Sequence, residues 1–269
     1  VIRGVHLYGP LMRAVIASAS NDHRLGANEA PPAIMSVYLG SQLEDIFNQI
    51  KSGSLQGSSH KGQMHLGVDT LPPLTKDAGD RNRTSPFAFT GNRFEFRAVG
   101  SSQSVSGPLI ALNTMMADSL NWMCDQLDGK LSGGGDVGNA VQAVLKEIMD
   151  KHGAAVFGGN GYSDEWHKEA VEQRGLLNIP TTADALPHLN SPAIKTLFES
   201  TGVLSPVELE SRYEVYAEQY ILSIDVEAKL VADMAKTLIY PAAMRHLSES
   251  AGAIANLSDI GVSVDKAPV

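Results

Sequence analysis

Five consecutive residues, Arg93-Phe94-Glu95-Phe96-Arg97, alternate between charged and aromatic side chains. A period of two is the side-chain repeat of a β-strand, so a strand here sends Phe94 and Phe96 to one face and the three charged residues to the other. The aromatic face suits a protein core, and the opposite face presents a carboxylate between two arginines. The pattern predicts a strand over residues 93–97, within a strand pair that spans residues 81–97.

The charged face of this strand is a candidate binding surface. A second arginine pair, Arg81 and Arg83, stands shortly before it. Arginine forks bind phosphate and carboxylate, and a carboxylate oxygen binds a divalent cation, so ATP with its metal matches the set. Two other interpretations are open: Glu95 with Arg93 and Arg97 as an ion-pair ladder on a solvated sheet, and the second arginine pair as a solvated turn.

The bulk composition limits the classes of partner. Of the 269 residues, 43% are hydrophobic and 19% are charged, which is typical of a globular chain. The formal net charge of −9 lacks the basic excess of a general binder of nucleic acid or of anionic membranes. Neither partner is expected, although the locally clustered arginines are compatible with a phosphate ligand.

The single cysteine, Cys124, cannot form a disulfide within the chain, so a reducing compartment is the simpler interpretation. No apolar run approaches the roughly 18 residues that cross a bilayer, and no segment has the order of a signal peptide. We therefore expect a cytoplasmic protein. The chain opens at Val1 directly on a helical pattern, from which we expect that further sequence precedes it.

Helical spacing of apolar residues dominates the second half of the chain. Gly129 and the run Gly133–Gly135 predict a hinge, with one part over residues 1–128 and a second over 129–269. Pro241 is expected to kink or end the last and longest helix, which starts near Pro206. The expected helical segments are 1–20, 109–127, 137–149, 164–174, 192–199 and about nine turns from residue 206 onward.

Two further motifs have an ordinary explanation beside a functional one. His60 and His65 lie in a stretch over 52–80 that reads as a long surface loop, and two histidines without a cysteine or carboxylate cluster are a weak zinc signal. The glycines of residues 158–161 precede a helix and could cradle phosphate. A capping turn with Ser163 as the N-cap is the simpler interpretation.

Arg24 and Glu29 stand in a polar segment over residues 21–34, where Glu29 by itself reads as a helix-start or turn residue. The segment reads Asn-Asp-His-Arg-Leu-Gly-Ala-Asn-Glu-Ala-Pro-Pro-Ala-Ile. Together with Asn82–Phe89 and Asn92–Arg97, it resembles glutamine synthetase of the long, type III class. The helical half is similar to that class in residues 159–166, 184–187 and 211–214.

This resemblance implies an α+β fold: a portion of the catalytic domain with an antiparallel sheet over residues 1–128, followed by an all-helical C-terminal extension over 129–269. It implies an enzyme of nitrogen assimilation that makes glutamine from glutamate, ammonia and ATP through γ-glutamyl phosphate. The implied cofactor is Mg²⁺, or Mn²⁺ in its place, with ATP as co-substrate. Family members are ring-shaped homo-oligomers, so further copies of the chain are implied partners.

The resemblance also implies roles for single residues. Glu95 would hold a metal ion that bridges substrate and phosphate oxygens. Arg97 would bind the carboxylate of glutamate, and Arg24 would meet the transferring phosphoryl group or the substrate carboxylate. Arg83 would bind the nucleotide phosphates, and Arg93 is a weaker candidate for phosphate contact.

Glu29 would close over the acyl phosphate, exclude water and help to take the proton from ammonium. The chain departs from the family pattern at Ala88, where shorter members carry a second phosphate-side arginine. The family's other metal-binding carboxylates and its metal-ligating histidine lie upstream of the segment that matches Asn21. Glu95 would then be the only metal ligand present, and we expect the isolated chain to be inactive.

Two rival functions are open. The first is another ATP-using enzyme of related architecture, such as a glutamyl-amine ligase or a guanidino kinase, which differs in the space near Glu29. The second is a catalytically dead paralogue or a helical assembly module that keeps the motifs by descent. A strand that placed Glu95 and Arg97 on opposite faces would argue against both enzymes.

Overall fold

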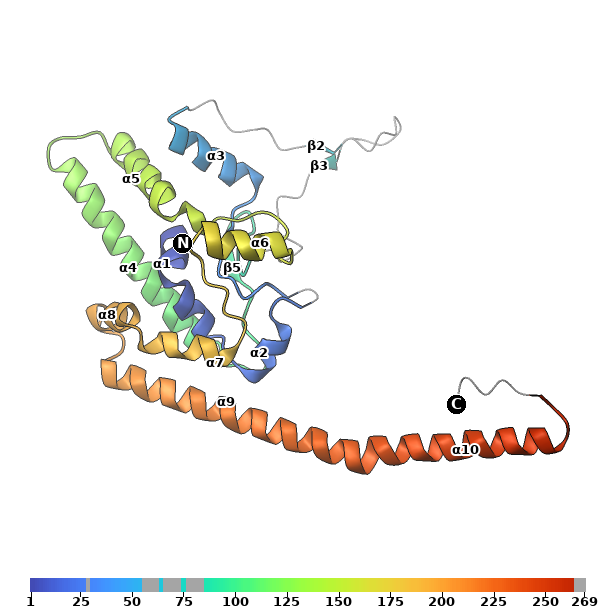
Figure 1. Ribbon diagram of the computed structural model, residues 1–269. Helices are drawn as coiled ribbons and strands as arrows, with labels where there is room; N and C mark the ends of the chain where they lie inside the picture. Colours follow the sequence, from blue (N-terminus) through green and yellow to red (C-terminus); the bar gives the residue numbers. More distant parts are fainter. Residues whose placement is uncertain (28–29, 55–62, 65–73, 76–84, 264–269) are drawn as a thin grey trace. The chain divides into compact units, whose positions relative to one another are not determined.

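The computed structural model describes residues 1–27, 30–54, 63–64, 74–75 and 85–263 (Figure 1). The predicted site residues Glu29 and Arg83 lie outside these ranges, as do Arg81 and the two histidines of the 52–80 stretch. Contacts within the described chain divide it into two compact units, residues 1–217 and 218–269.

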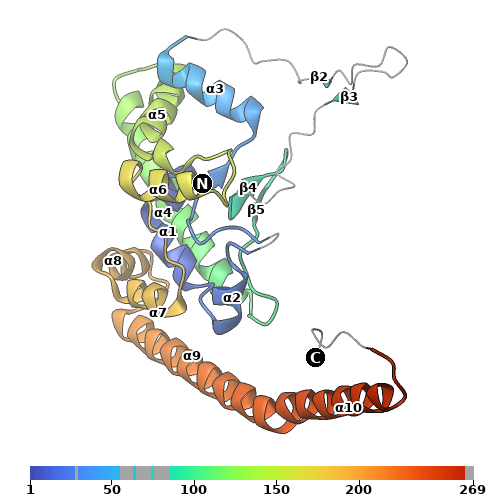
Figure 2. The same cartoon turned by 45° about the vertical axis from the view of Figure 1, so that its right-hand side comes forward.

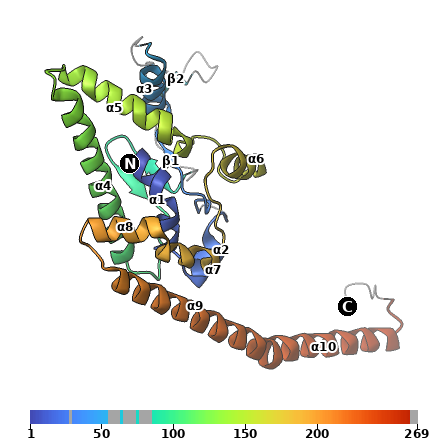
Figure 3. The same cartoon turned by 60° about the vertical axis from the view of Figure 1, so that its left-hand side comes forward.

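Helix α1, Ile2–Ala14, is the central helix of the first unit. It packs against α4 (Ser106–Leu131) and α5 (Val137–His152), and Figure 3 shows these two long helices beside it. Its backbone leaves helical geometry at Tyr8, two residues before Pro10, whose ring removes a backbone donor and crowds the preceding turn.

The predicted helix over residues 1–20 is too long. The chain leaves α1 after Ala14 and enters a second short helix, α2 (Ala19–Arg24). Ser18 starts α2 as its N-cap, because its side chain accepts a hydrogen bond from the backbone N–H of Asn21. This break places Arg24 at the end of a separate helix.

The first unit also contains a small mixed sheet, visible in Figure 2. Strand β4 (Phe87–Phe89) is central, parallel to β1 (Val37–Tyr38) and antiparallel to β5 (Phe94–Phe96). The α+β class is confirmed. Within this three-stranded sheet the β4–β5 pair is antiparallel as expected, whereas β1 pairs with β4 in parallel. The remaining elements before α4 are α3 (Ser41–Ser52) and the antiparallel pair β2 (Gln63–Met64) and β3 (Leu74–Thr75).

The predicted alternation along residues 93–97 is confirmed. The rings of Phe94 and Phe96 lie 5.6 and 5.8 Å from that of Phe87, measured between centroids, so the phenylalanines share one face. A tight turn joins β4 to β5, in which the Thr90 N–H donates to the Arg93 carbonyl at 2.8 Å. Gly91 has a φ of +96° in this turn, a conformation that suits glycine.

Residues after α5 complete the same unit. Val156 bridges Val37 of β1, and Asn178 bridges Ile34, so this segment extends the sheet edge. Trp166 is buried and stacks on Phe157 with 3.5 Å between ring centroids. The elements here are 3-10 helix η1 (Gly153–Ala155), α6 (Asp164–Lys168), π-helix η2 (Glu169–Gln173), α7 (Thr182–Ala185), 3-10 helix η3 (Leu186–Asn190) and α8 (Pro192–Ser200).

Several predictions on the helical half have a direct outcome. The N-cap role of Ser163 is confirmed, since its hydroxyl accepts from the Trp166 N–H. A hinge at Gly129 is wrong, because α4 continues through that residue to Leu131, and the turn comes at Gly133–Gly135. Residues on both sides of position 128 belong to one compact unit. The division into a catalytic-domain portion up to residue 128 and a C-terminal extension after it stays a prediction from the family resemblance.

The second unit, residues 218–269, contains the later part of α9 (Pro206–Met234), the π-helix η4 (Ala235–Ile239) and α10 (Tyr240–Asp259). The predicted effect of Pro241 is confirmed, because regular α-helix stops before it and resumes with the proline in the first turn of α10. Proline cannot donate the backbone hydrogen bond that a continuous helix requires. Among the described helices, none has the apolar length that a bilayer crossing requires.

Candidate functional site

The three charged side chains of residues 93–97 form one ion-paired row on the face of β5 opposite the phenylalanines. Arg93 donates to Oε1 of Glu95 from Nε at 3.0 Å and from Nη2 at 2.9 Å. Arg97 donates from Nε to Oε2 at 3.2 Å. Hydrogen bonds from Arg93, and then from Arg97, lower the pKa of the Glu95 carboxyl. Glu95 is therefore an ionised acceptor between two cations.

Exposure falls along this row away from the hairpin turn. The side chain of Arg93 is 69% exposed, that of Glu95 34% and that of Arg97 18%. Arg97 thus lies at the sheltered end, where a bound carboxylate would lose the most water. A fork in a sheltered position binds anions more strongly than one in open solvent.

Arg24 from α2 meets this sheltered end. Its Nη2 donates to the carbonyl of Arg97 and its Nη1 to the carbonyl of Ala98, both at 3.1 Å. Two arginines that are far apart in the sequence, one on a helix and one after a strand, are therefore neighbours. The structure brings together Arg24, Arg93, Glu95 and Arg97 out of the predicted site residues, and Glu29 and Arg83 are outside the described ranges.

Helix α2 is held from its other side by Asp22. Its Oδ1 accepts from Nη2 of Arg13 at 3.3 Å and from the hydroxyl of Thr182 at 2.7 Å. Arg13 also donates to the carbonyls of Ile179 at 2.7 Å and Pro180 at 3.0 Å. Burial lowers the pKa of Arg13, although the Asp22 charge opposes this. The charge of Arg13 is therefore used inside the fold, where it fixes α2.

Ala88 faces Glu95 directly across the β4–β5 pair. Directly opposed residues of an antiparallel pair point to the same face of the sheet. A long side chain at this position would point to the face of Glu95, whereas Ala88 is fully buried and adds no charge. On this face the structure therefore describes Arg93 and Arg97 of the β5 row, and no charge from Ala88.

Within the described residues, no group of three or more His, Cys, Asp or Glu side chains could hold a metal ion. Glu95 nevertheless fits as one ligand. A carboxylate offers about four acceptor sites, two on each oxygen, and the arginine bonds fill both sites of Oε1 and one of Oε2. One site on Oε2 is left for a cation whose other ligands come from elsewhere.

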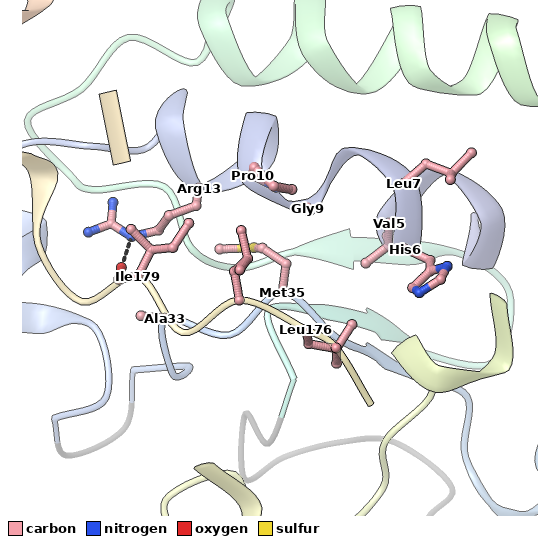
Figure 4. Close-up of a pocket in the computed structure, with 12 residues that line it drawn as sticks. Val5, His6, Leu7, Gly9, Pro10, Arg13, Ala33, Met35, Leu176 and Ile179 are labelled. Carbon is pink, nitrogen blue, oxygen red and sulfur yellow. Dashed lines mark hydrogen bonds between the residues drawn. The ribbon is translucent and has the colours of Figure 1, made fainter. Parts of the chain in front are cut away.

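A separate cleft of about 260 Å³ runs beside α1 (Figure 4). Its walls come from α1, from the segment before β1 and from residues 175–179, and they include His6, Ala33, Met35 and Leu176. The figure shows the guanidinium of Arg13 bound to the Ile179 carbonyl at one end. The polar side chains of its lining are His6 and Arg13, and both form hydrogen bonds within the fold, to His152 and to the Ile179 carbonyl.

Sequence reasoning missed Asn21 and Gln103 at the sheltered end. Asn21 is fully buried, and its side chain contacts Arg24, Gln103 and the backbone of the strand end. Its position three residues before Arg24 on a helix was a usable signal, because such residues are neighbours on the helix surface. No local signal marks Gln103.

The chain was compared with known proteins. Residues 140–258 match the family model of the glutamine synthetase C-terminal domain. The chain is 46% identical over 259 residues to the type-3 glutamine synthetase of Dictyostelium discoideum, a match that covers 94% of this chain and 35% of that protein. It is 40% identical over 250 residues to a glutamine synthetase of Bacteroides fragilis (91% and 34% covered) and 40% identical over 236 residues to one of Butyrivibrio fibrisolvens (87% and 33%).

The chain thus spans about a third of the length of the curated relatives that it matches. The resemblance first seen in the motifs over residues 21–34 and 82–97 extends through both the sheet and the helical half. By these matches the chain is similar over most of its length to part of a type-3 glutamine synthetase, and its residues 140–258 match the glutamine synthetase C-terminal domain.

Proposed function

We propose that the chain supplies the substrate-binding and phosphate-binding residues of an ATP-dependent ligase, which joins ammonia to glutamate through γ-glutamyl phosphate. One observation carries the proposal: the guanidinium of Arg24 is hydrogen-bonded to the backbone carbonyl of Arg97, whose own side chain is paired with Glu95. Two cationic forks and one carboxylate at one place match a reaction between a carboxylate and a phosphate. The names of the relatives support the same reaction.

In this proposal the sheltered end binds the reacting groups. Arg97 takes the carboxylate of glutamate, and Arg24 takes the phosphoryl group in transfer or that same carboxylate. Phosphoryl transfer depends mainly on alignment and on neutralised charge, which fixed arginines provide. Arg93, the most exposed of the three, reaches the nucleotide phosphates together with Arg83. Glu29 closes the site against water and helps to deprotonate ammonium.

Glu95 is one ligand of the divalent cation, Mg²⁺ or Mn²⁺, and carboxylates elsewhere in the enzyme complete its coordination. The ion, when bound, neutralises the charge of the transferred phosphate. Glu95 keeps its arginine bonds through three acceptor sites, so the arginines and the metal can share one carboxylate. A cation held by Glu95 would supply positive charge for the phosphate in addition to that of Arg93 and Arg97.

The exposed apolar surface of the second unit supports a role in subunit assembly, in addition to the catalytic role proposed above. Large apolar side chains of α9 and α10 are exposed in residues 218–263, and a surface of this kind marks an interaction site. We propose that it joins copies of the chain in a ring-shaped homo-oligomer in the cytoplasm. The exposed apolar residues of this part are Ile221, Leu222, Ile224, Val226, Leu230, Val231, Met234, Leu238, Ile239, Tyr240, Met244, Leu247, Leu257, Ile260 and Val262.

The test is glutamine formation by the full-length protein from glutamate, ammonia and ATP with Mg²⁺. Replacing Arg97 by Lys removes the fork but keeps the charge, so kcat/KM should fall by about 100-fold. The matched substitution Arg245→Lys, at an exposed position of α10, should leave it unchanged. A full-length protein that makes no glutamine, or an Arg97→Lys variant with normal kcat/KM, would contradict the proposal.

The same assay separates the rival functions. A glutamyl-amine ligase would use a larger amine, such as ethylamine, in preference to ammonia. An assembly module would hydrolyse no ATP under any of these conditions and would keep its oligomeric state in the Arg97→Lys variant.

A further inference from the structure

We propose that Asn21 is a positioning residue, which fixes the guanidinium of Arg24 at the end of β5. In this orientation a pair of adjacent N–H donors of Arg24 faces the substrate. This inference rests on the proposed function, because it takes Arg24 as a residue that binds the reacting groups. Asn21 itself is fully buried and reaches the site only through Arg24.

The hydrogen bonds of Asn21 fix the orientation of its amide. Its Nδ2 is surrounded by three acceptors: the carbonyl of Ile16 at 2.7 Å, the carbonyl of Ala98 at 3.1 Å and Oε1 of Gln103 at 3.2 Å. Three acceptors require the amide nitrogen on this side, since the amide oxygen has no hydrogen to donate and would face three other oxygens. The oxygen Oδ1 must therefore point the other way, towards Arg24.

Oδ1 of Asn21 accepts from Nη1 of Arg24 at 3.1 Å. Nη1 also donates to the carbonyl of Ala98, and Nη2 donates to that of Arg97. These bonds use three of the five N–H groups that an arginine carries. Within the described chain, Nε–H and the second N–H of Nη2 have no acceptor, and Nε and Nη2 are adjacent on the guanidinium. They form a fork of the width that binds a carboxylate or phosphate in two places.

The fixed guanidinium has a consequence for binding. A free arginine side chain loses rotamer entropy when it is immobilised on a ligand. Arg24 is already immobilised by Asn21 and two backbone carbonyls, so a ligand meets a fork that is in place. A small displacement of such a group can reduce the rate by about 100-fold.

Asn21 is itself held by the loop after β5. Oε1 of Gln103 accepts from the Gly100 N–H at 3.1 Å, and Nε2 of Gln103 donates to the carbonyl of Ala17 at 3.2 Å. A Cβ atom on Gly100 would lie 3.1 Å from Oε1 of Gln103 and 3.3 Å from Oδ1 of Asn21. Gly100→Ala therefore presses first on the side chains of Gln103 and Asn21.

The test is a double-mutant cycle in the full-length protein, with kcat/KM for glutamine formation as the readout. Asn21→Ala and Arg24→Ala are made singly and together. If Asn21 acts through Arg24, Asn21→Ala costs about 10- to 100-fold in the wild-type background and less than about twofold in the Arg24→Ala background. Gly100→Ala should give a smaller loss that likewise disappears when Arg24 is absent.

Asp22→Asn is the matched control for loss of structure. Asp22 lies on the same helix and anchors it to Arg13 and Thr182, but it makes no hydrogen bond to Arg24. This variant should lower the unfolding midpoint while it keeps kcat/KM below that temperature. Asn21→Leu, which has the size of asparagine, repeats the test without a cavity if the alanine variant fails to fold.

The outcomes separate the two proposals. One outcome overturns the positioning role alone: the wild type is active, Arg24→Ala is weak, and Asn21→Ala either has no effect or has the same effect with and without Arg24. A wild type that forms no glutamine, or an Arg24→Ala variant of normal activity, overturns the proposed function and the positioning role together.

Discussion

His6 and His152 face each other with their Nδ1 atoms 2.9 Å apart, which joins α1 to α5. Only one of the two facing nitrogens can carry a hydrogen without conflict, so the contact requires at least one neutral ring. Burial, followed by repulsion from His6 and Arg3, lowers the pKa of His152 to about 4. Burial also lowers the pKa of His6. Lys151 adds repulsion and Glu147 opposes it.

This pair predicts that the chain loses stability in mild acid. The unfolded chain binds protons near the ordinary histidine pKa of about 6.5, whereas the folded chain resists them until a lower pH. The contribution of this pair to the free energy of unfolding is therefore fully present above about pH 6.5 and is lost towards pH 4. The loss is roughly 1–2 kcal/mol once partial exposure to water is allowed for. Urea unfolding between pH 7.5 and 4.5 measures the change.

His152→Asn should flatten this pH dependence, since asparagine keeps a hydrogen-bonding group and does not titrate. His246→Asn, at an exposed position of α10, is the control and should leave the dependence as it is. Equal slopes for the wild type and His152→Asn would show that other groups cause the acid sensitivity.

Gly91 and Gly129 should respond to alanine with opposite signs. Gly91 has a φ of +96° in the β4–β5 turn, so Gly91→Ala should cost about 1–2 kcal/mol of unfolding free energy. Gly129 lies inside α4, and apart from its chain neighbours and the helix's own backbone no atom lies within 4 Å of an added Cβ there. Gly129→Ala should therefore gain roughly 0.5–1 kcal/mol. Thermal unfolding of the two variants checks this, and a loss at both positions would contradict the helical geometry of Gly129.

The isolated 269-residue chain should form no glutamine. Its described residues contain no three-ligand metal cluster, and one carboxylate cannot balance several divalent cations beside phosphates. A coupled assay for ADP release, with the full-length protein as the positive control, measures the activity. Any glutamine formed by the isolated chain in proportion to its concentration would be evidence for a complete metal site within it.

The apolar stripe of the second unit should control assembly. Val226, Leu230 and Met234 are exposed and spaced by four residues, so they share one side of α9. Leu230→Glu should lower the mass measured by sedimentation, because an interface buries such side chains and a charge there is costly. Ala232→Glu adds the same charge on the opposite side of the helix and should leave the mass unchanged. An identical mass for the wild type and Leu230→Glu would exclude this stripe as an interface.

The sequence alone predicted much of the local structure and part of the site. The alternation of residues 93–97 placed Glu95 and Arg97 on one face, the cap at Ser163 started a helix, and Pro241 interrupted one. These features depend on interactions within a few residues, so a local pattern is enough to define them. The family motifs in the sequence were enough to assign Arg24 to the candidate site.

Two predictions about helix ends failed, because the local preference of the residues did not decide where the helix stops. Gly129 has a low helix propensity, yet α4 continues through it to Leu131. Helical spacing continued past Ala14, but the cap at Ser18 started a new helix. In both places the outcome depended on neighbours that a periodic pattern does not describe.

The tertiary structure decided which residues became neighbours. It placed Arg24 on the backbone of Arg97, buried Asn21 behind it, and brought His152 to His6. Such contacts arise because the packed chain must satisfy its buried donors and acceptors with whichever groups the fold brings near. Patterns in the sequence determine on which face of a strand or helix a side chain lies. Only the folded chain determines which residues from other segments pack against that face.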